Sequence, residues 1–216
     1  MYETVIFDLD GTLLDTLDDL ASAVNAALKR YSLPCRKKEE VRAFIGNGAR
    51  KLMERAVGGQ SSLVDEALSE FYAYYQAHCK DDTKPYQGIL ELLLRLKERG
   101  IKTAVLSNKP DFAVKLLAEE YFGGLLELAV GENEGAGIRK KPAPDALFLV
   151  LKSLGVDKKS AVYVGDSEVD IQTAQAAGMD CICVTWGFKD KEFLAENGGK
   201  TFIDEPAQLL EYCKEK

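Results

Sequence analysis

The chain has 216 residues, of which 46% are hydrophobic and 29% are charged, and its net charge is -7. These proportions are ordinary for a globular protein, and the length allows one domain with an insertion. The negative charge argues against partners such as nucleic acid or an anionic membrane, and we expect neither. No apolar run approaches membrane-spanning length, and the five cysteines lack metal-ligand spacing, so we expect a cytoplasmic protein with reduced thiols.

A short apolar run followed by two acidic residues opens the chain. Residues 5–7 have the pattern of a buried parallel strand, and Gly11 ends it, so Asp8 and Asp10 leave the sheet at its carboxyl edge. Open α/β sheets bind their ligands at that edge. Two carboxylates this close repel each other, and a shared proton or a bound cation relieves the repulsion. The motif indicates a metal site, although a strand end followed by an Asx turn explains it equally well when it is taken alone.

Helical periodicity replaces the strand pattern after this first strand. Apolar residues recur at helical spacing through residues 17–78. This pattern predicts a helical insert within an α/β domain. We therefore expect a core domain formed by residues 1–14 and 86–216, and a helical cap domain formed by residues 15–85.

A turn with two glycines lies inside the predicted insert. Gly46, Asn47 and Gly48 stand between two helical stretches, and Arg50 follows them. Such a turn can bring backbone amides or the arginine over the cleft of the core, or it can simply end one helix and begin the next. Both interpretations stay open, and we keep Gly48 and Arg50 as candidate substrate-binding residues.

Short apolar strands alternate with helices in the rest of the chain, a pattern typical of a parallel sheet with helices on both faces. The further expected strands are residues 101–106, 126–130, 161–164 and 181–184. Right-handed crossovers give the strand order 3-2-1-4-5, with the first strand in the middle. The sequence therefore predicts a Rossmann-like α/β fold, in which the strands on either side of the first one end at the same edge as Asp8.

Further polar motifs stand at the strand–helix junctions of this predicted sheet. Ser107 and Asn108 follow the second strand, Lys141 precedes a helix, and Asp166 and Asp170 follow the strand at 161–164. Each motif alone has an ordinary explanation as a helix cap, a solvated lysine or a turn. Four motifs in this order, each at such a junction, favour one shared site.

The ordered set of motifs resembles the haloacid dehalogenase superfamily, and within it the phosphoglycolate phosphatases. The residues that carry the likeness are Asp8-Leu9-Asp10-Gly11-Thr12-Leu13, Ser107-Asn108, Lys141-Pro142 and Gly165-Asp166-Ser167 with Asp170. The second aspartate, Asp10, is similar to that of the phosphoryl-transfer members, since the dehalogenases themselves lack it. Weaker likenesses to phosphoglycolate phosphatases lie in residues 44–49, 71–78 and 84–88.

This resemblance implies a phosphomonoesterase that acts through an aspartyl-phosphate intermediate on a small anionic metabolite, with 2-phosphoglycolate as the expected substrate. Asp8 is the candidate nucleophile. Asp10 would protonate the leaving alkoxide and then activate the water that hydrolyses the intermediate. Lys141 and Ser107, with Asn108 beside them, would bind and stabilise the transferring phosphoryl group.

A divalent metal is part of the same expectation. The resemblance implies side-chain ligation by Asp8 and Asp166 and a contact from the backbone carbonyl of Asp10. Asp170 lies one helical turn beyond Asp166, and we include it among the metal-site residues in a supporting position. Hard oxygen ligands and a phosphoryl substrate describe Mg²⁺ better than Zn²⁺. The cofactor we expect is therefore Mg²⁺.

Two other functions remain open at this point. A sugar phosphomutase of the β-phosphoglucomutase type shares every core motif and differs in its cap and in the fate of the phosphoenzyme. A non-catalytic signalling module that accepts a phosphoryl group also combines an aspartate, acidic metal ligands, a hydroxyl and a lysine, but Asp10 and the helical insert argue against it. The sequence leaves the oligomeric state open between a monomer and a homodimer.

Overall fold

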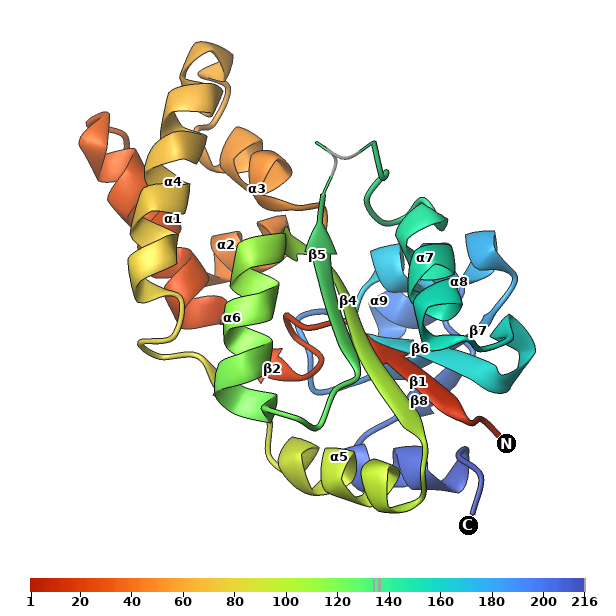
Figure 1. Ribbon diagram of the computed structural model, residues 1–216. Coiled ribbons are helices and arrows are strands. Elements are labelled where there is room, and N and C mark those ends of the chain that lie inside the picture. Colours follow the sequence, from red (N-terminus) through yellow and green to blue (C-terminus); the bar gives the residue numbers. More distant parts are fainter. Residues whose placement is uncertain (134, 136, 216) are drawn as a thin grey trace. The chain divides into compact units, whose positions relative to one another are not determined.

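The chain folds into two compact units, seen in a computed structural model that describes residues 1–133, 135 and 137–215 (Figure 1). Met1–Leu14 and Pro85–Lys216 form one of them, which we call the sheet unit, and Asp15–Lys84 forms the other, which we call the helical unit. The chain passes between the units twice, through the short strands β2 (Leu14–Asp15) and β3 (Lys84–Pro85), which pair with each other.

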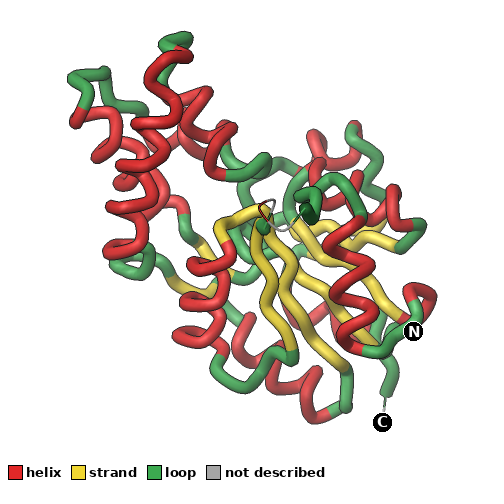
Figure 2. Tube along the Cα trace, turned by 45° about the horizontal axis from the view of Figure 1, so that its top comes forward, coloured by secondary structure: helices red, strands yellow, loops and turns green. Residues whose placement is uncertain are grey.

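Six parallel strands form the sheet of the sheet unit within the described residues (Figure 2). In spatial order they are β5 (Leu128–Glu132), β4 (Lys102–Pro110), β1 (Thr4–Phe7), β6 (Ala161–Gly165), β7 (Asp180–Val184) and β8 (Thr201–Ile203). Every neighbouring pair is parallel. The prediction of a parallel α/β sheet is therefore confirmed, and β8 is an additional edge strand that the sequence analysis did not include.

The central strand β1 sets the level at which the polar residues leave the sheet. All four of its residues are buried, as expected for an apolar strand covered on both faces. Phe7 is in register with Val105 of β4 and with Val164 of β6. The residues that follow Phe7 and Val164 therefore leave the sheet together at its carboxyl edge, beside the last residues of β4.

Strand β4 is longer than the sequence pattern predicts. It continues past Leu106 to Pro110, where it pairs with Glu132 of β5 after a shift in register. Ser107 and Asn108 therefore lie within the strand rather than after it. The extension is possible because β1 ends at Phe7, so the last residues of β4 pair with β5 alone.

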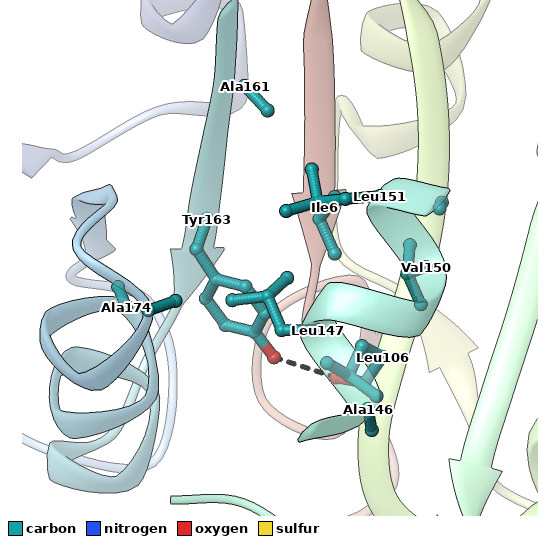
Figure 3. Close-up of a cluster of buried hydrophobic side chains, with 11 residues drawn as sticks. Ile6, Leu106, Ala146, Leu147, Val150, Leu151, Ala161, Tyr163 and Ala174 are labelled. Atoms are coloured by element: carbon teal, nitrogen blue, oxygen red, sulfur yellow. Dashed lines mark hydrogen bonds between the residues drawn. The ribbon is translucent and has the colours of Figure 1, made fainter. Parts of the chain in front are cut away.

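Helices cover both faces of this sheet. Those of the sheet unit are α5 (Ile89–Glu98), α6 (Asp111–Phe122), α7 (Asp145–Leu154), α8 (Glu168–Ala177) and α9 (Lys191–Glu196), with the 3-10 turns η3 (Lys158–Ser160) and η4 (Pro206–Glu211). Right-handed crossovers place α5 and α6 on one face and α7 and α8 on the other. On the α7 face, Ile6 and Tyr163 of the sheet pack with Leu147 and Val150 in a buried cluster (Figure 3). Each such aliphatic side chain contributes about 1.5–3 kcal/mol on burial.

The helical unit is built from amphipathic helices. They are α1 (Leu17–Arg30), α2 (Lys38–Phe44), α3 (Ala49–Ala56) and α4 (Val64–His78), with a 3-10 turn η1 (Ser61–Leu63). Helices α1 and α4 lie side by side (Figure 1). The buried carboxylate of Asp19 accepts hydrogen bonds from the backbone N–H and hydroxyl of Thr83, which ties the end of the unit to α1. None of the helices in the described part of the chain has the length and apolar content needed to cross a membrane.

Candidate active site

Three buried carboxylates meet at the carboxyl edge of the sheet. Asp8 follows β1, Asp166 follows β6, and Asp170 lies in the first turn of α8. Each offers a carboxylate oxygen, and these atoms all lie within 4.8 Å of one another. The structure thus brings together residues that are 162 positions apart in the chain, because their strands are neighbours in the sheet. An all-oxygen donor set of this kind suits a hard divalent cation such as Mg²⁺.

The position of Asp166 is fixed by close packing and by hydrogen bonds. Its carboxylate accepts a bond from the hydroxyl of Thr12 at 3.3 Å and from the backbone N–H of Phe188 at 2.7 Å. A Cβ atom at Gly11, which has φ +80°, would lie 2.3 Å from Oδ2 of Asp166, and one at Gly187 would lie 2.3 Å from its Cβ. Only glycines allow the backbone to approach this carboxylate so closely.

Lys141 connects the nucleophile candidate to the rest of the cluster. Its Nζ lies 3.0 Å from Oδ1 of Asp8 and 2.7 Å from Oδ1 of Asp170. It also donates to the Tyr163 hydroxyl at 3.0 Å, and that hydroxyl donates to the Leu106 carbonyl at 2.7 Å (Figure 3). Burial opposes the charge on this lysine, but Asp170 and Asp8 outweigh it and raise the pKa of Lys141, so the ammonium form persists.

Neighbouring polar groups hold Lys141 and Asp170 in place. The Asn108 amide donates to the backbone carbonyl of Lys141 at 3.0 Å and accepts from its N–H at 2.9 Å. The second oxygen of Asp170 accepts from the N–H and hydroxyl of Ser167, at 3.0 and 2.6 Å. Ser107 is buried and its hydroxyl hydrogen-bonds to Asp8. The amide of Asn108 therefore orients the lysine segment, a role that the sequence analysis did not assign.

Asp10 has a lysine partner of its own that the sequence analysis missed. The Nζ of Lys109 lies 2.7 Å from Oδ1 of Asp10, and the two side chains are 1% and 13% exposed. The sequence holds a partial signal, since Lys109 follows Ser107 by two residues and alternate residues of a strand lie on the same face, but this spacing does not identify Asp10 as the partner. The strand expected from the sequence ends at residue 106, before both residues, whereas β4 continues to Pro110.

The electrostatics of the cluster favour binding of a cation. When all are ionised, the four carboxylates of Asp8, Asp10, Asp166 and Asp170 outnumber the ammonium groups of Lys109 and Lys141 by two negative charges. Burial raises the pKa of Asp8 to about 6, with repulsion from Asp170 and Asp10 adding to it and Lys141 opposing it. Burial, together with Asp170 and Asp8, also raises the pKa of Asp166 well above its usual value. A divalent cation would balance the two remaining charges.

The candidate residues in the helical unit have partners within that unit. Gly48 is the N-cap of α3 with φ +86°, and the Arg50 guanidinium pairs with Asp65 at 2.5 Å, both side chains being at least half exposed. Arg55 stabilises the turn at Gly46-Asn47-Gly48 by donating to the side chain of Asn47 at 2.7 Å and to the carbonyl of Phe44 at 2.6 Å.

Comparisons with known proteins bear on the whole chain. The family model for haloacid dehalogenase-like hydrolases matches residues 5–184. A phosphoglycolate phosphatase of Pseudomonas syringae pv. tomato is 38% identical over 97% of this chain and 79% of its own length. One of Colwellia psychrerythraea is 35% identical over 96% of this chain and 95% of its own length. The crystal structure of a protein from Lactobacillus delbrueckii subsp. bulgaricus is 39% identical, covers 98% of both chains and superimposes with a TM-score of 0.90. A predicted phosphoglycolate phosphatase from Haemophilus somnus is 29% identical, covers 98% of this chain and 97% of its own, and gives a TM-score of 0.89.

Proposed function

This chain belongs to the haloacid dehalogenase-like hydrolase family, and on that basis we propose that it is a Mg²⁺-dependent phosphomonoesterase whose substrate is 2-phosphoglycolate. The observation that carries the proposal is the buried Asp8 carboxylate, which lies 3.0 Å from the Lys141 ammonium and in one cluster with Asp166. The names of the relatives at 35–38% identity support the substrate. We also propose a small phosphorylated metabolite as the partner of this protein. The cytoplasm is the proposed location, which five free thiols support.

Two displacements at phosphorus make up the proposed reaction. The Asp8 carboxylate attacks phosphorus and forms an aspartyl phosphate, while the bond to the leaving oxygen breaks and Asp10 donates its proton to that oxygen. The Asp10 carboxylate then takes a proton from a water molecule, which attacks the phosphorus of the intermediate. Inorganic phosphate leaves, Asp8 is regenerated, and the proton returned to Asp10 restores it as an acid. Lys141 and the Ser107 hydroxyl stabilise the charge on the phosphoryl oxygens in both steps.

The metal would be held by the side chains of Asp8 and Asp166 and by the backbone carbonyl of Asp10. When bound, Mg²⁺ supplies positive charge that offsets the repulsion between these carboxylates and the phosphoryl group. Asp170 uses one oxygen for Lys141 and the other for Ser167, so we assign it the role of orienting the lysine rather than of a direct ligand. This arrangement resembles the support that outer residues give to metal sites in general.

We further propose that the helical unit is the cap and that its Arg50 recognises the carboxylate of the substrate. The pair with Asp65 is exposed on both sides, so water and salt screen it and Arg50 can exchange Asp65 for a substrate carboxylate easily. Arg50→Ala should lower the preference for phosphoglycolate over a neutral alkyl phosphate by on the order of a hundredfold if the pair is desolvated when substrate binds. Lys51→Ala is the matched control, because Lys51 is equally exposed and pairs with Glu54 of its own helix. An unchanged preference in Arg50→Ala would remove Arg50 from the proposal.

A turnover screen tests the proposed function directly. The protein is incubated with phosphorylated metabolites of two to six carbons, with Mg²⁺ present and then with a chelator, and phosphate release is measured. We expect the fastest release from phosphoglycolate, none with the chelator, and no phosphoenzyme in Asp8→Asn. Conversion of one sugar phosphate into its isomer without phosphate release would instead indicate a phosphomutase. A stable aspartyl phosphate without turnover would indicate a signalling module.

A further inference from the structure

We infer that Lys109 is a positioning residue for Asp10, whose ammonium group holds the Asp10 carboxylate in the orientation that both proton transfers require. This inference rests on the proposed function, in which Asp10 is the general acid and then the general base. Lys109 lies outside the sequence motifs named above, and this role would be its contribution to the reaction.

The burial of Lys109 is the first observation behind the inference. Its side chain is 1% exposed, and lysine is almost never buried to this extent unless it is paired. The Nζ atom lies 2.7 Å from Oδ1 of Asp10, which is the distance of a short charge-assisted hydrogen bond. An ammonium group buried beside this carboxylate therefore fixes the direction of that oxygen rather than covering the surface.

The second observation is that the two lead aspartates have different lysine partners. Lys141, from the segment before α7, lies 3.0 Å from Asp8, whereas Lys109, from the end of β4, lies 2.7 Å from Asp10. Ser107, two residues before Lys109 in the same strand, hydrogen-bonds to Asp8. The end of β4 therefore supplies a hydroxyl to the nucleophile and an ammonium group to the acid and base.

The backbone around Asp10 is also held, so Lys109 acts on the side-chain torsions of Asp10. Asp10 forms a bridge with Leu14, and the N–H of Gly11 donates to the Leu14 carbonyl at 2.9 Å. General acid–base catalysis depends on the catalytic oxygen being within hydrogen-bond reach of the reacting atom. Small displacements of positioned groups cost large factors in rate. Loss of the Lys109 ammonium group should therefore slow the two proton-transfer steps that use Asp10.

Leaving-group dependence separates this role from a purely structural one. With an aryl phosphate the leaving group needs no acid, and kcat/KM reports only the steps up to the first chemical displacement. Lys109→Met should leave kcat/KM for p-nitrophenyl phosphate within about threefold and lower kcat/KM for an alkyl phosphate by about a hundredfold. Aspartyl phosphate should also accumulate during turnover of the aryl substrate, because its hydrolysis needs the base. Lys115→Met is the matched control, since Lys115 is exposed and pairs with Asp111 on α6. It should leave kcat/KM unchanged for both the aryl and the alkyl phosphate.

A double-mutant comparison decides whether Lys109 acts through Asp10. Adding Lys109→Met to Asp10→Asn should cause no further loss with the alkyl substrate. Equal losses for both substrates in Lys109→Met, or a further loss in the double variant, would overturn the inference. If Lys109→Met does not fold, Lys109→Gln takes its place under the same criteria. If Asp10→Asn itself lacks the leaving-group effect, the acid role of Asp10 in the proposed function fails; if it has the effect and the Lys109 variants lack it, only the positioning role of Lys109 fails.

Discussion

Replacing Lys141 by methionine should destabilise the sheet unit strongly, because it leaves buried charges without their partner. Methionine keeps most of the apolar stem of lysine and removes the ammonium group. The side chain is 2% exposed in its contacts with Asp8 and Asp170, so water cannot substitute for the lost donor. The Tyr163 hydroxyl loses the same donor.

The size of the effect follows from these contacts. Two charge-assisted contacts, at 3.0 Å to Asp8 and 2.7 Å to Asp170, would each contribute about 1.5–3 kcal/mol. Breaking a buried ion pair by removing one partner costs about 3–5 kcal/mol, which agrees with the sum of two such contacts. We therefore expect the free energy of unfolding to fall by about 3–5 kcal/mol in metal-free buffer near neutral pH.

Urea unfolding followed by tryptophan fluorescence measures this loss of stability in the sheet unit. Trp186 is the single tryptophan, it belongs to the sheet unit, and its indole N–H donates to the Thr12 carbonyl at 3.0 Å. Lys115→Met, which removes an exposed lysine, should stay within about 0.5 kcal/mol of the parent protein. A loss of less than about 1 kcal/mol in Lys141→Met would refute the reasoning, because the ammonium group would then not be neutralising buried carboxylates.

Three further predictions concern the same cluster. In metal-free buffer Asp8 should lower the free energy of unfolding as the pH rises from about 4 to about 6, because its pKa is raised from 3.8 to about 6 in the folded protein and the unfolded chain ionises first. Chemical denaturation over this pH range should therefore show the parent protein losing stability relative to Asp8→Asn, and parallel curves for the two proteins would contradict the prediction. Tyr163→Phe should lower the unfolding free energy by about 1–3 kcal/mol, since the Leu106 carbonyl and Lys141 both lose the hydroxyl, and an unchanged urea midpoint would count against that network. Gly11→Ala should weaken Mg²⁺ binding in calorimetric titration, because its Cβ would lie 2.3 Å from Oδ2 of Asp166; parent-like affinity would mean that this close approach is not required.

The parallel sheet and the residues at its edge were accessible to sequence analysis for a physical reason. A strand buried on both faces is a continuous apolar run, as in residues 5–7, and this pattern needs no knowledge of its neighbours. The handedness of the crossovers then restricts which strands lie beside it. Asp8 and Asp166 can be assigned to one edge from their positions after strands alone.

The contacts of Lys109 and Asn108 could not be obtained in this way. Lys109 pairs with Asp10, 99 residues earlier, and the Asn108 amide faces the backbone of Lys141 rather than open solvent. Both depend on the continuation of β4 beyond Leu106, which local patterns argue against because Pro110 lacks an N–H. Pairing with β5 at the end of the sheet overrides that local signal. Partner choice among buried polar side chains is decided by tertiary geometry, which sequence periodicity does not contain.

The charge balance of the cluster also gives a physical reason to expect a positively charged side chain outside it that binds part of the substrate. With one divalent ion bound, the four carboxylates and two ammonium groups of this cluster would balance when all are charged, and a proton on Asp10 would add only one positive charge, so most of the negative charge of a phosphorylated carboxylic acid would stay uncompensated. In the proposed reaction, hydrogen bonds from Ser107 and from backbone N–H groups would offset part of that charge around the phosphoryl oxygens. The carboxylate of the proposed substrate, phosphoglycolate, takes no part in the displacement and would need a separate cation. An exposed arginine whose present partner is a weakly bound surface carboxylate, as Arg50 is with Asp65, has the chemistry to provide it at little cost in stability.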